Sequence, residues 1–157
     1  MMNDGFTLAL MAVLAAMLVW IAIEDVRTYT ISDRLNLAIA LLAPLYWLSA
    51  GVPLWPDAAI RVGVGVLVFM LFAGAFYINA MGGGDVKLAG ALALWFSPYE
   101  TLTLIVIMSI AGGVLTLAVA GMHRARRKEG RPEVPYGVAI AMGGLWLLAQ
   151  RFLNHFA

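Results

Sequence analysis

Long apolar stretches alternate with short polar segments along nearly the whole chain. Several stretches approach the roughly 20 residues that an α-helix needs to cross a bilayer. We therefore predict an all-α, polytopic membrane bundle of about six helices, formed by one domain over residues 1–157. The predicted spans are residues 6–24, 35–49, 58–79, 86–96, 101–121 and 134–152.

The composition supports a membrane location and excludes several kinds of site. The chain is 63% hydrophobic and 12% charged, whereas soluble domains are about 45–50% apolar and about 25% charged. A net charge of +1 gives no basic field for binding nucleic acid. With no cysteine and two histidines, we expect no disulfide, cysteine nucleophile, metal site or cofactor.

The basic residues predict the orientation. The stretch 86–96 is only about 17 Å long as a helix, against a hydrocarbon core of about 30 Å. Counting it as a crossing places eight of the ten Lys and Arg residues on one side, which the positive-inside rule assigns to the cytoplasm. These eight are Arg27, Arg34, Lys87, Arg124, Arg126, Arg127, Lys128 and Arg131. Both termini are then non-cytoplasmic, and the basic run 124–131 is expected to contact anionic lipid.

Two carboxylates lie at the same predicted face. Asp25 ends the first span, and Asp85 follows three glycines at the start of the fourth. Ionisable residues at membrane depth are costly and point to function. Two carboxylates at short range tend to share one proton. In that state one of them can take a proton from water while the other donates to a scissile carbonyl.

Other interpretations remain open from the residues alone. Asp85 can be a helix cap, or each aspartate can be an interfacial charge paired with Arg27 or Lys87. Glu24 and Asp33 are rival carboxylates, although neighbours on a helix point about 100° apart, so only one of Glu24 and Asp25 can face a site well. A small non-catalytic membrane subunit or a proton- or ion-coupled transporter component also uses buried carboxylates. A relay would string polar groups across the bilayer, and the spans contain almost none.

Three segments resemble type IV prepilin peptidases. Residues 82–87, Gly-Gly-Gly-Asp-Val-Lys, match the G-x-G-D-x-K signature of that family. Residues 25–27 with Ile31 resemble its first aspartate segment, and residues 135–137 resemble the proline-aromatic-glycine start of its last conserved helix. The resemblance implies that Asp25 and Asp85 are catalytic. It implies substrate-binding or site-shaping roles for Arg27, Gly82, Gly84, Lys87, Pro135, Tyr136 and Gly137.

The resemblance also implies the substrate and the location. We expect a hydrolase of the bacterial inner membrane that cleaves the short leader peptide of a prepilin or pseudopilin at the cytoplasmic face. Many members carry a cytoplasmic segment with paired CxxC motifs and also N-methylate the product. This chain has no cysteine and is similar to the short form associated with Flp-type pili, so we expect no methyltransferase activity. Ser32 stands where the family often has proline. The sequence does not indicate the oligomeric state.

Overall fold

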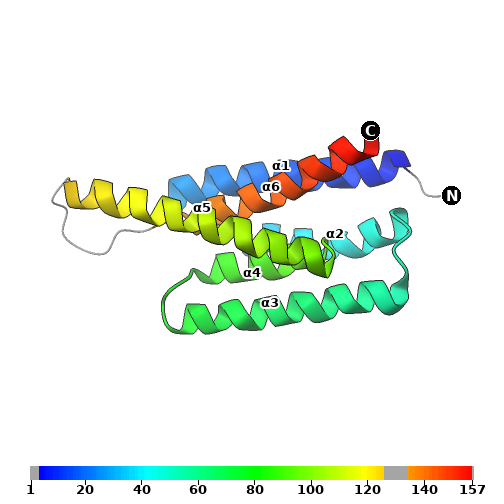
Figure 1. Ribbon diagram of the computed structural model, residues 1–157, viewed down its shortest axis with the longest axis horizontal. Coiled ribbons are helices and arrows are strands. Elements are labelled where there is room, and N and C mark those ends of the chain that lie inside the picture. The colour runs from blue at the N-terminus through cyan, green and yellow to red at the C-terminus, as the bar shows by residue number, and fades with distance from the viewer. Residues whose placement is uncertain (1–3, 126–133, 157) are drawn as a thin grey trace.

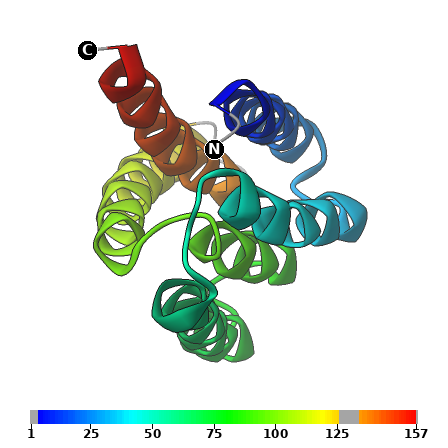
Figure 2. The ribbon, with the colours of Figure 1, turned by 90° about the vertical axis from the view of Figure 1, so that its right-hand side faces the viewer.

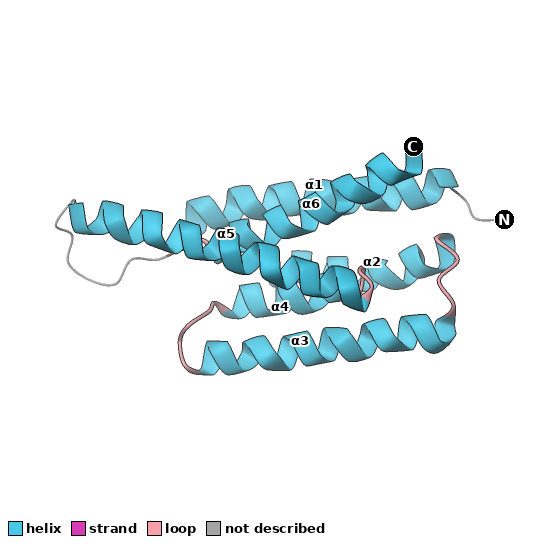
Figure 3. Cartoon of the chain, in the orientation of Figure 1, coloured by secondary structure: helices cyan, strands magenta, loops and turns pink. Residues whose placement is uncertain are grey.

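The computed structural model describes residues 4–125 and 134–156, which fold into helices joined by short loops (Figures 1 and 3). The elements are α1 (Asp4–Thr28), α2 (Asp33–Ser49), the short helical turn η1 (Leu54–Ala58), α3 (Ala59–Tyr77), α4 (Gly83–Ala93), α5 (Pro98–Ala125) and α6 (Tyr136–Phe156). The predicted all-α bundle is therefore confirmed.

Within residues 4–125 and 134–156, four segments are long and apolar enough to cross a membrane: α1, η1 with α3, α5 and α6. The other two helices are shorter, at 17 residues for α2 and 11 for α4. The expected short fourth helix is thus present. Figure 1 shows that α4 ends inside the bundle, short of the end that α2 and α3 reach, and that α5 begins there.

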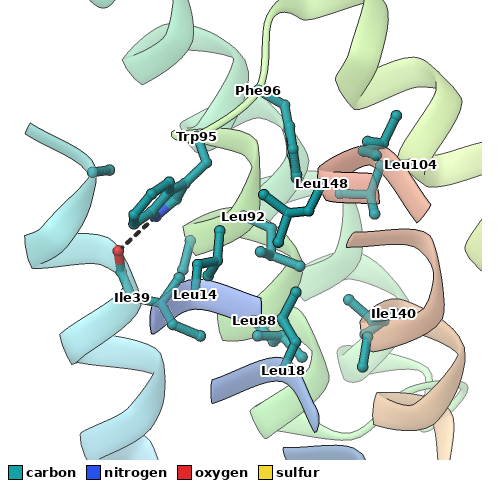
Figure 4. Close-up of a cluster of buried hydrophobic side chains, with 14 of the residues drawn as sticks. Leu14, Leu18, Ile39, Leu88, Leu92, Trp95, Phe96, Leu104, Ile140 and Leu148 are labelled. Atoms are coloured by element: carbon teal, nitrogen blue, oxygen red, sulfur yellow. Dashed lines mark hydrogen bonds between the residues drawn. The ribbon is translucent and has the colours of Figure 1, made fainter. Parts of the chain in front are cut away.

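The short helix α4 is central. Eight of its 11 residues are buried, and it packs against α2, α3 and α6 (Figure 2). Its inward side chains Leu88 and Leu92 are fully buried and meet Leu14 and Leu18 of α1 and Ile140 of α6 (Figure 4). This core holds the first turn of α4 between the end of α1 and the start of α6.

The deep end of α4 is closed by donors from its neighbours. The last carbonyls of a helix have no partner within the helix, and in a bilayer they need one from elsewhere. Trp47 Nε1 donates to Leu94 O at 2.8 Å, and Arg61 Nη1 donates to Trp95 O at 2.8 Å. Arg151 Nη2 donates to the same Trp95 carbonyl at 3.2 Å. A helix that stops inside the bundle is therefore satisfied at its buried end.

Arg151 is itself held by a carboxylate and a phenol. Its guanidinium donates to Glu100 through Nε (2.8 Å) and Nη2 (2.7 Å), and through Nη1 to Tyr46 Oη (2.7 Å). Glu100 also accepts from the Ser97 backbone N–H at 2.7 Å. Arg61 and Arg151 are the two basic residues that the predicted orientation leaves on the non-cytoplasmic side. The structure shows that both donate to the Trp95 carbonyl and so brace the end of α4.

Candidate active site

Asp25 lies on the buried stripe of α1. Leu14, Leu18 and Ile21 precede it at helical spacing, and all three are fully buried. Asp25 continues the same stripe four residues after Ile21 and is only 3% exposed. Its Oδ2 accepts a hydrogen bond of 3.2 Å from the Val138 backbone N–H. Val138 lies in the first turn of α6, and its N–H is shared between Asp25 and the Pro135 carbonyl, to which it donates at 3.3 Å.

Asp85 lies in the first turn of α4 and is 8% exposed. The backbone of Gly82, the residue that precedes the helix, lies against its carboxylate, since a Cβ atom on Gly82 would be 2.9 Å from Asp85 Oδ2. This position suits an interaction with the positive end of the helix. Burial beside a second carboxylate is a feature that capping alone does not explain.

The two aspartates line one cavity of about 500 Å³. Both carboxylates are buried, with Asp25 3% and Asp85 8% exposed. The other lining residues come from the end of α1 and the loop after it, from the loop before α4, from α5 and from the residues around the start of α6. They are Thr28, Tyr29, Thr30, Asn79, Ala80, Met81, Gly82, Thr116, Val134 and Tyr136. The loops after α1 and before α4 lie at the same end of the bundle (Figure 1). The topology therefore brings together two carboxylates that are far apart in the sequence.

Ile31, in the loop after α1, lies against the first turns of both α4 and α6. Its side chain is 8% exposed. A Cβ atom on Gly84 would lie 3.0 Å from Ile31 Cβ, and one on Gly137 would lie 2.7 Å from Ile31 Cδ1. The two glycines therefore let α4 and α6 approach the same isoleucine closely.

Asn36 joins α2 to the first turn of α4. Its Nδ2 donates to the Gly84 carbonyl at 3.0 Å, and the residue is 4% exposed. The acceptor belongs to the residue directly before Asp85. We infer that Asn36 helps to fix the backbone that carries this carboxylate.

Tyr136 closes the cavity against α5. A Cβ atom on Gly112 would overlap the Tyr136 ring, so glycine is needed there for the tyrosine to lie against α5. Thr116, one turn further along α5, lines the cavity beside Tyr136. Pro135 is buried directly before the helix.

The flanking charges lie elsewhere. Lys87 Nζ forms an ion pair of 2.7 Å with Asp33 Oδ1, and both side chains are largely exposed. Arg27 is exposed, and neither basic residue is among those lining the cavity. Glu24 and Asp33 do not line it either. Within residues 4–125 and 134–156, the pairing of either aspartate with Arg27 or Lys87 is not observed.

Several contributors were missed from the sequence. The Val138 donor is a backbone group and leaves no sequence signal. Asn36 was visible as an amide in an apolar helix, which is a usable signal because buried polar groups require partners. Residues 126–131, which form most of the basic run 124–131, lie outside the described residues, so the predicted lipid contact of this run stays a prediction.

The site is chemically suited to acid–base work. One ionised carboxylate can take a proton from water while a neutral one donates to a carbonyl. Among the described residues, no cluster of three or more His, Cys, Asp or Glu side chains could hold a metal ion. The side chains that line the cavity supply the two carboxylates, the Asn79 carboxamide and the hydroxyls of Thr28, Tyr29, Thr30, Thr116 and Tyr136.

Comparisons with known proteins point to one family. Residues 12–117 match the model of the type IV leader peptidase family. This match includes Asp25 and Asp85 and ends before the start of α6. No solved structure matches the chain significantly.

Curated relatives extend the similarity. A prepilin leader peptidase/N-methyltransferase from Pectobacterium carotovorum is 27% identical over 146 residues, which cover 90% of this chain and 51% of the relative. A protein of the same name from Burkholderia pseudomallei is 31% identical over 151 residues, covering 90% of this chain and 46% of the relative. The chain thus spans about half the length of the curated relatives it matches.

Proposed function

This chain belongs to the type IV leader peptidase family, and from that membership we propose that it is an intramembrane aspartyl endopeptidase. It removes the short leader peptide of a prepilin, of the Flp-like kind, at the cytoplasmic face of the bacterial inner membrane. Asp25 and Asp85 are the catalytic pair, called the dyad below. The relatives named as leader peptidases support the substrate class.

The observation that carries the proposal is the shared cavity. Asp25 and Asp85 are both buried, on different helices, and both line the same space of about 500 Å³. Two carboxylates buried in one cavity cannot both ionise easily, so the pair favours a state with one proton between them. That state supplies both a base and an acid.

The reaction follows from this state. The ionised carboxylate takes a proton from a water molecule, which attacks the scissile carbonyl carbon. The neutral carboxylate donates its proton to the carbonyl oxygen, which gives a tetrahedral intermediate with two hydroxyl groups. The first carboxylate then passes its proton to the leaving amine while the second takes a proton back from one of these hydroxyls, so that the C–N bond breaks and the new carboxyl group forms. The Val138 N–H holds Asp25 in place during these steps, as preorganised donors do in other active sites.

Methyl transfer is the activity that we propose is absent. The relatives carry both activities in their names, and this chain aligns with about half of their length. It also lacks the cysteines that many larger members carry in an additional segment. We therefore propose that the half of the relatives that aligns with this chain carries the peptidase activity and not the methyltransferase activity.

The test uses the purified chain in detergent with a prepilin whose leader precedes an apolar helix. Intact-mass spectrometry should show release of the leader, no added methyl group when S-adenosylmethionine is present, and the same yield with EDTA. The matched control is the Asp25→Asn/Asp85→Asn double variant, which should leave the precursor intact. An uncleaved precursor with the wild-type chain would refute the peptidase proposal. A product methylated by this chain alone would refute the second part, and EDTA inhibition reversed by zinc would refute the metal-free mechanism.

A further inference from the structure

A second hollow lies on the other side of α4. It is a groove of about 740 Å³ between α2 and α3, with α4 as its floor. Both outer helices pack against α4 but scarcely against each other (Figure 2). Gly65 and Gly90 let α3 and α4 approach each other closely at the groove, since a Cβ atom on Gly65 would lie 3.3 Å from Gly90 O. The small side chains of Ala40 and Ala91 also line the groove, and small residues let another helix approach closely within a bilayer.

The groove is polar at one end only. Asp33, Asn36 and Lys87 lie at the end nearest the dyad, and the remaining lining residues are apolar. Asp33 begins α2, and Lys87 follows two residues after Asp85. The occupant that this gradient fits is an apolar helix whose polar or charged end lies at the level of the dyad.

The polar end is continuous with the first turn of α4. Asn36 lines the groove and donates to Gly84 O, while Asp85 lines the catalytic cavity on the other side of the same turn. Gly83 lies against Phe76 and Gly84 against Ile31, whereas Gly82 is exposed. An extended segment that leaves the groove can therefore cross this turn at Gly82, close to the backbone, and reach the dyad.

We propose that this groove binds the apolar helix of the precursor, with the residues before that helix crossing the glycine turn to the dyad. The inference rests on the proposed function, because it assigns a place to that substrate. The exposed Asp33 carboxylate, now paired with Lys87, is available to a basic group of the leader. A lipid chain would need neither this charged pair nor a path to the dyad.

Crosslinking tests the docking independently of cleavage. The chain has no cysteine, so Val66→Cys places a single thiol in the groove. Leu67→Cys is the matched control, because Leu67 is the next residue of α3, is 67% exposed and is not among the groove-lining residues. Both are made in the Asp85→Asn background and oxidised with precursors that carry one cysteine at successive positions of the apolar helix. Val66→Cys should crosslink roughly tenfold more than the control, because docking raises the local concentration.

A kinetic test uses Val66→Trp with Leu67→Trp as its control. Filling the groove should raise KM for the full precursor roughly tenfold, equivalent to about 1.4 kcal/mol. It should leave cleavage of a leader peptide without the apolar helix unchanged. Equal crosslinking at the two positions, with normal cleavage by the wild-type chain, would refute the groove and leave the peptidase proposal intact. Selective crosslinking without any cleavage would refute the peptidase and leave the groove as a helix-binding site.

Discussion

Gly137 lies directly against Asp25. A Cβ atom on this glycine would be 2.8 Å from Asp25 Oδ2 and 3.0 Å from Cγ. The absence of a side chain lets the first turn of α6 approach the carboxylate until the Val138 N–H can donate to it. The start of α6 therefore belongs to the candidate site as much as the two aspartates do.

Gly137→Ala should lower the cleavage rate. The new methyl group would displace the Asp25 carboxylate or the Val138 donor, and a misplacement of about 1 Å can cost about 10²-fold. Gly113→Ala is the matched control, because a Cβ atom there meets nothing within 4 Å and alanine favours the helix. The comparison is the initial rate of leader release by equal amounts of each membrane-inserted variant. Equal rates for the two variants would show that the close approach of α6 is unimportant.

Asp25→Asn and Asp85→Asn should each abolish leader cleavage without preventing membrane insertion. Each removes one of the two groups that exchange protons, and such groups typically contribute roughly 10²–10⁴-fold to a rate. Asp57→Asn is the control carboxylate, because Asp57 is exposed in η1 and lines neither the catalytic cavity nor the groove, so this variant should retain its activity. If Asp33→Asn were inactive while Asp25→Asn cleaved normally, the dyad would have to be reassigned.

The fold class and the approximate positions of the helices could be predicted from hydrophobicity, because the bilayer requires long apolar helices. The ends of the helices differ from the predicted ones by up to four residues, as at Thr28, Ala125 and Phe156. The faces of those helices could not be predicted. The first helix is apolar on nearly all sides, so its pattern does not reveal that Leu14, Leu18 and Ile21 face the interior. Only that packing explains why Asp25 is 3% exposed while the adjacent Glu24 does not line the cavity.

The hydrogen-bond partners within the site could not be predicted because they are far apart in the sequence. Asp25 meets the Val138 backbone 113 residues later, and Asn36 meets the Gly84 carbonyl 48 residues later. The Val138 N–H and the Gly84 carbonyl are main-chain groups, which nearly every residue possesses, so the sequence does not single them out. The bracing of α4 by Arg151 likewise depends on where that helix stops, which no local pattern specifies.

The ion pairs Arg151–Glu100 and Lys87–Asp33 should contribute differently to the free energy of unfolding. Arg151→Met removes the partner of Glu100, and the two side chains are only 16% and 25% exposed. We expect a loss of roughly 3 kcal/mol, the lower end for buried pairs, as well as the loss of a donor to the Trp95 carbonyl. Asp33→Asn breaks a pair with side chains that are 72% and 48% exposed and should cost about 1 kcal/mol or less. Thermal unfolding in detergent measures both, and equal shifts in Tm would contradict the bracing role.

Reporter fusions test the orientation on which cleavage at the cytoplasmic face depends. The described ends of the chain, at the start of α1 and the end of α6, lie opposite the end that holds the loops around the dyad (Figure 1). Eight of the ten Lys and Arg residues belong to the dyad side in the six-span arrangement. The positive-inside rule then assigns this side to the cytoplasm. Alkaline phosphatase fused after Ala157 should be active, and the same enzyme inserted at Gly130 should be inactive. A cytoplasmic reporter such as green fluorescent protein should give the reverse pattern at the two positions. Phosphatase activity at Gly130 would place Asp25 and Asp85 on the outer face and exclude cleavage of a cytoplasmic leader.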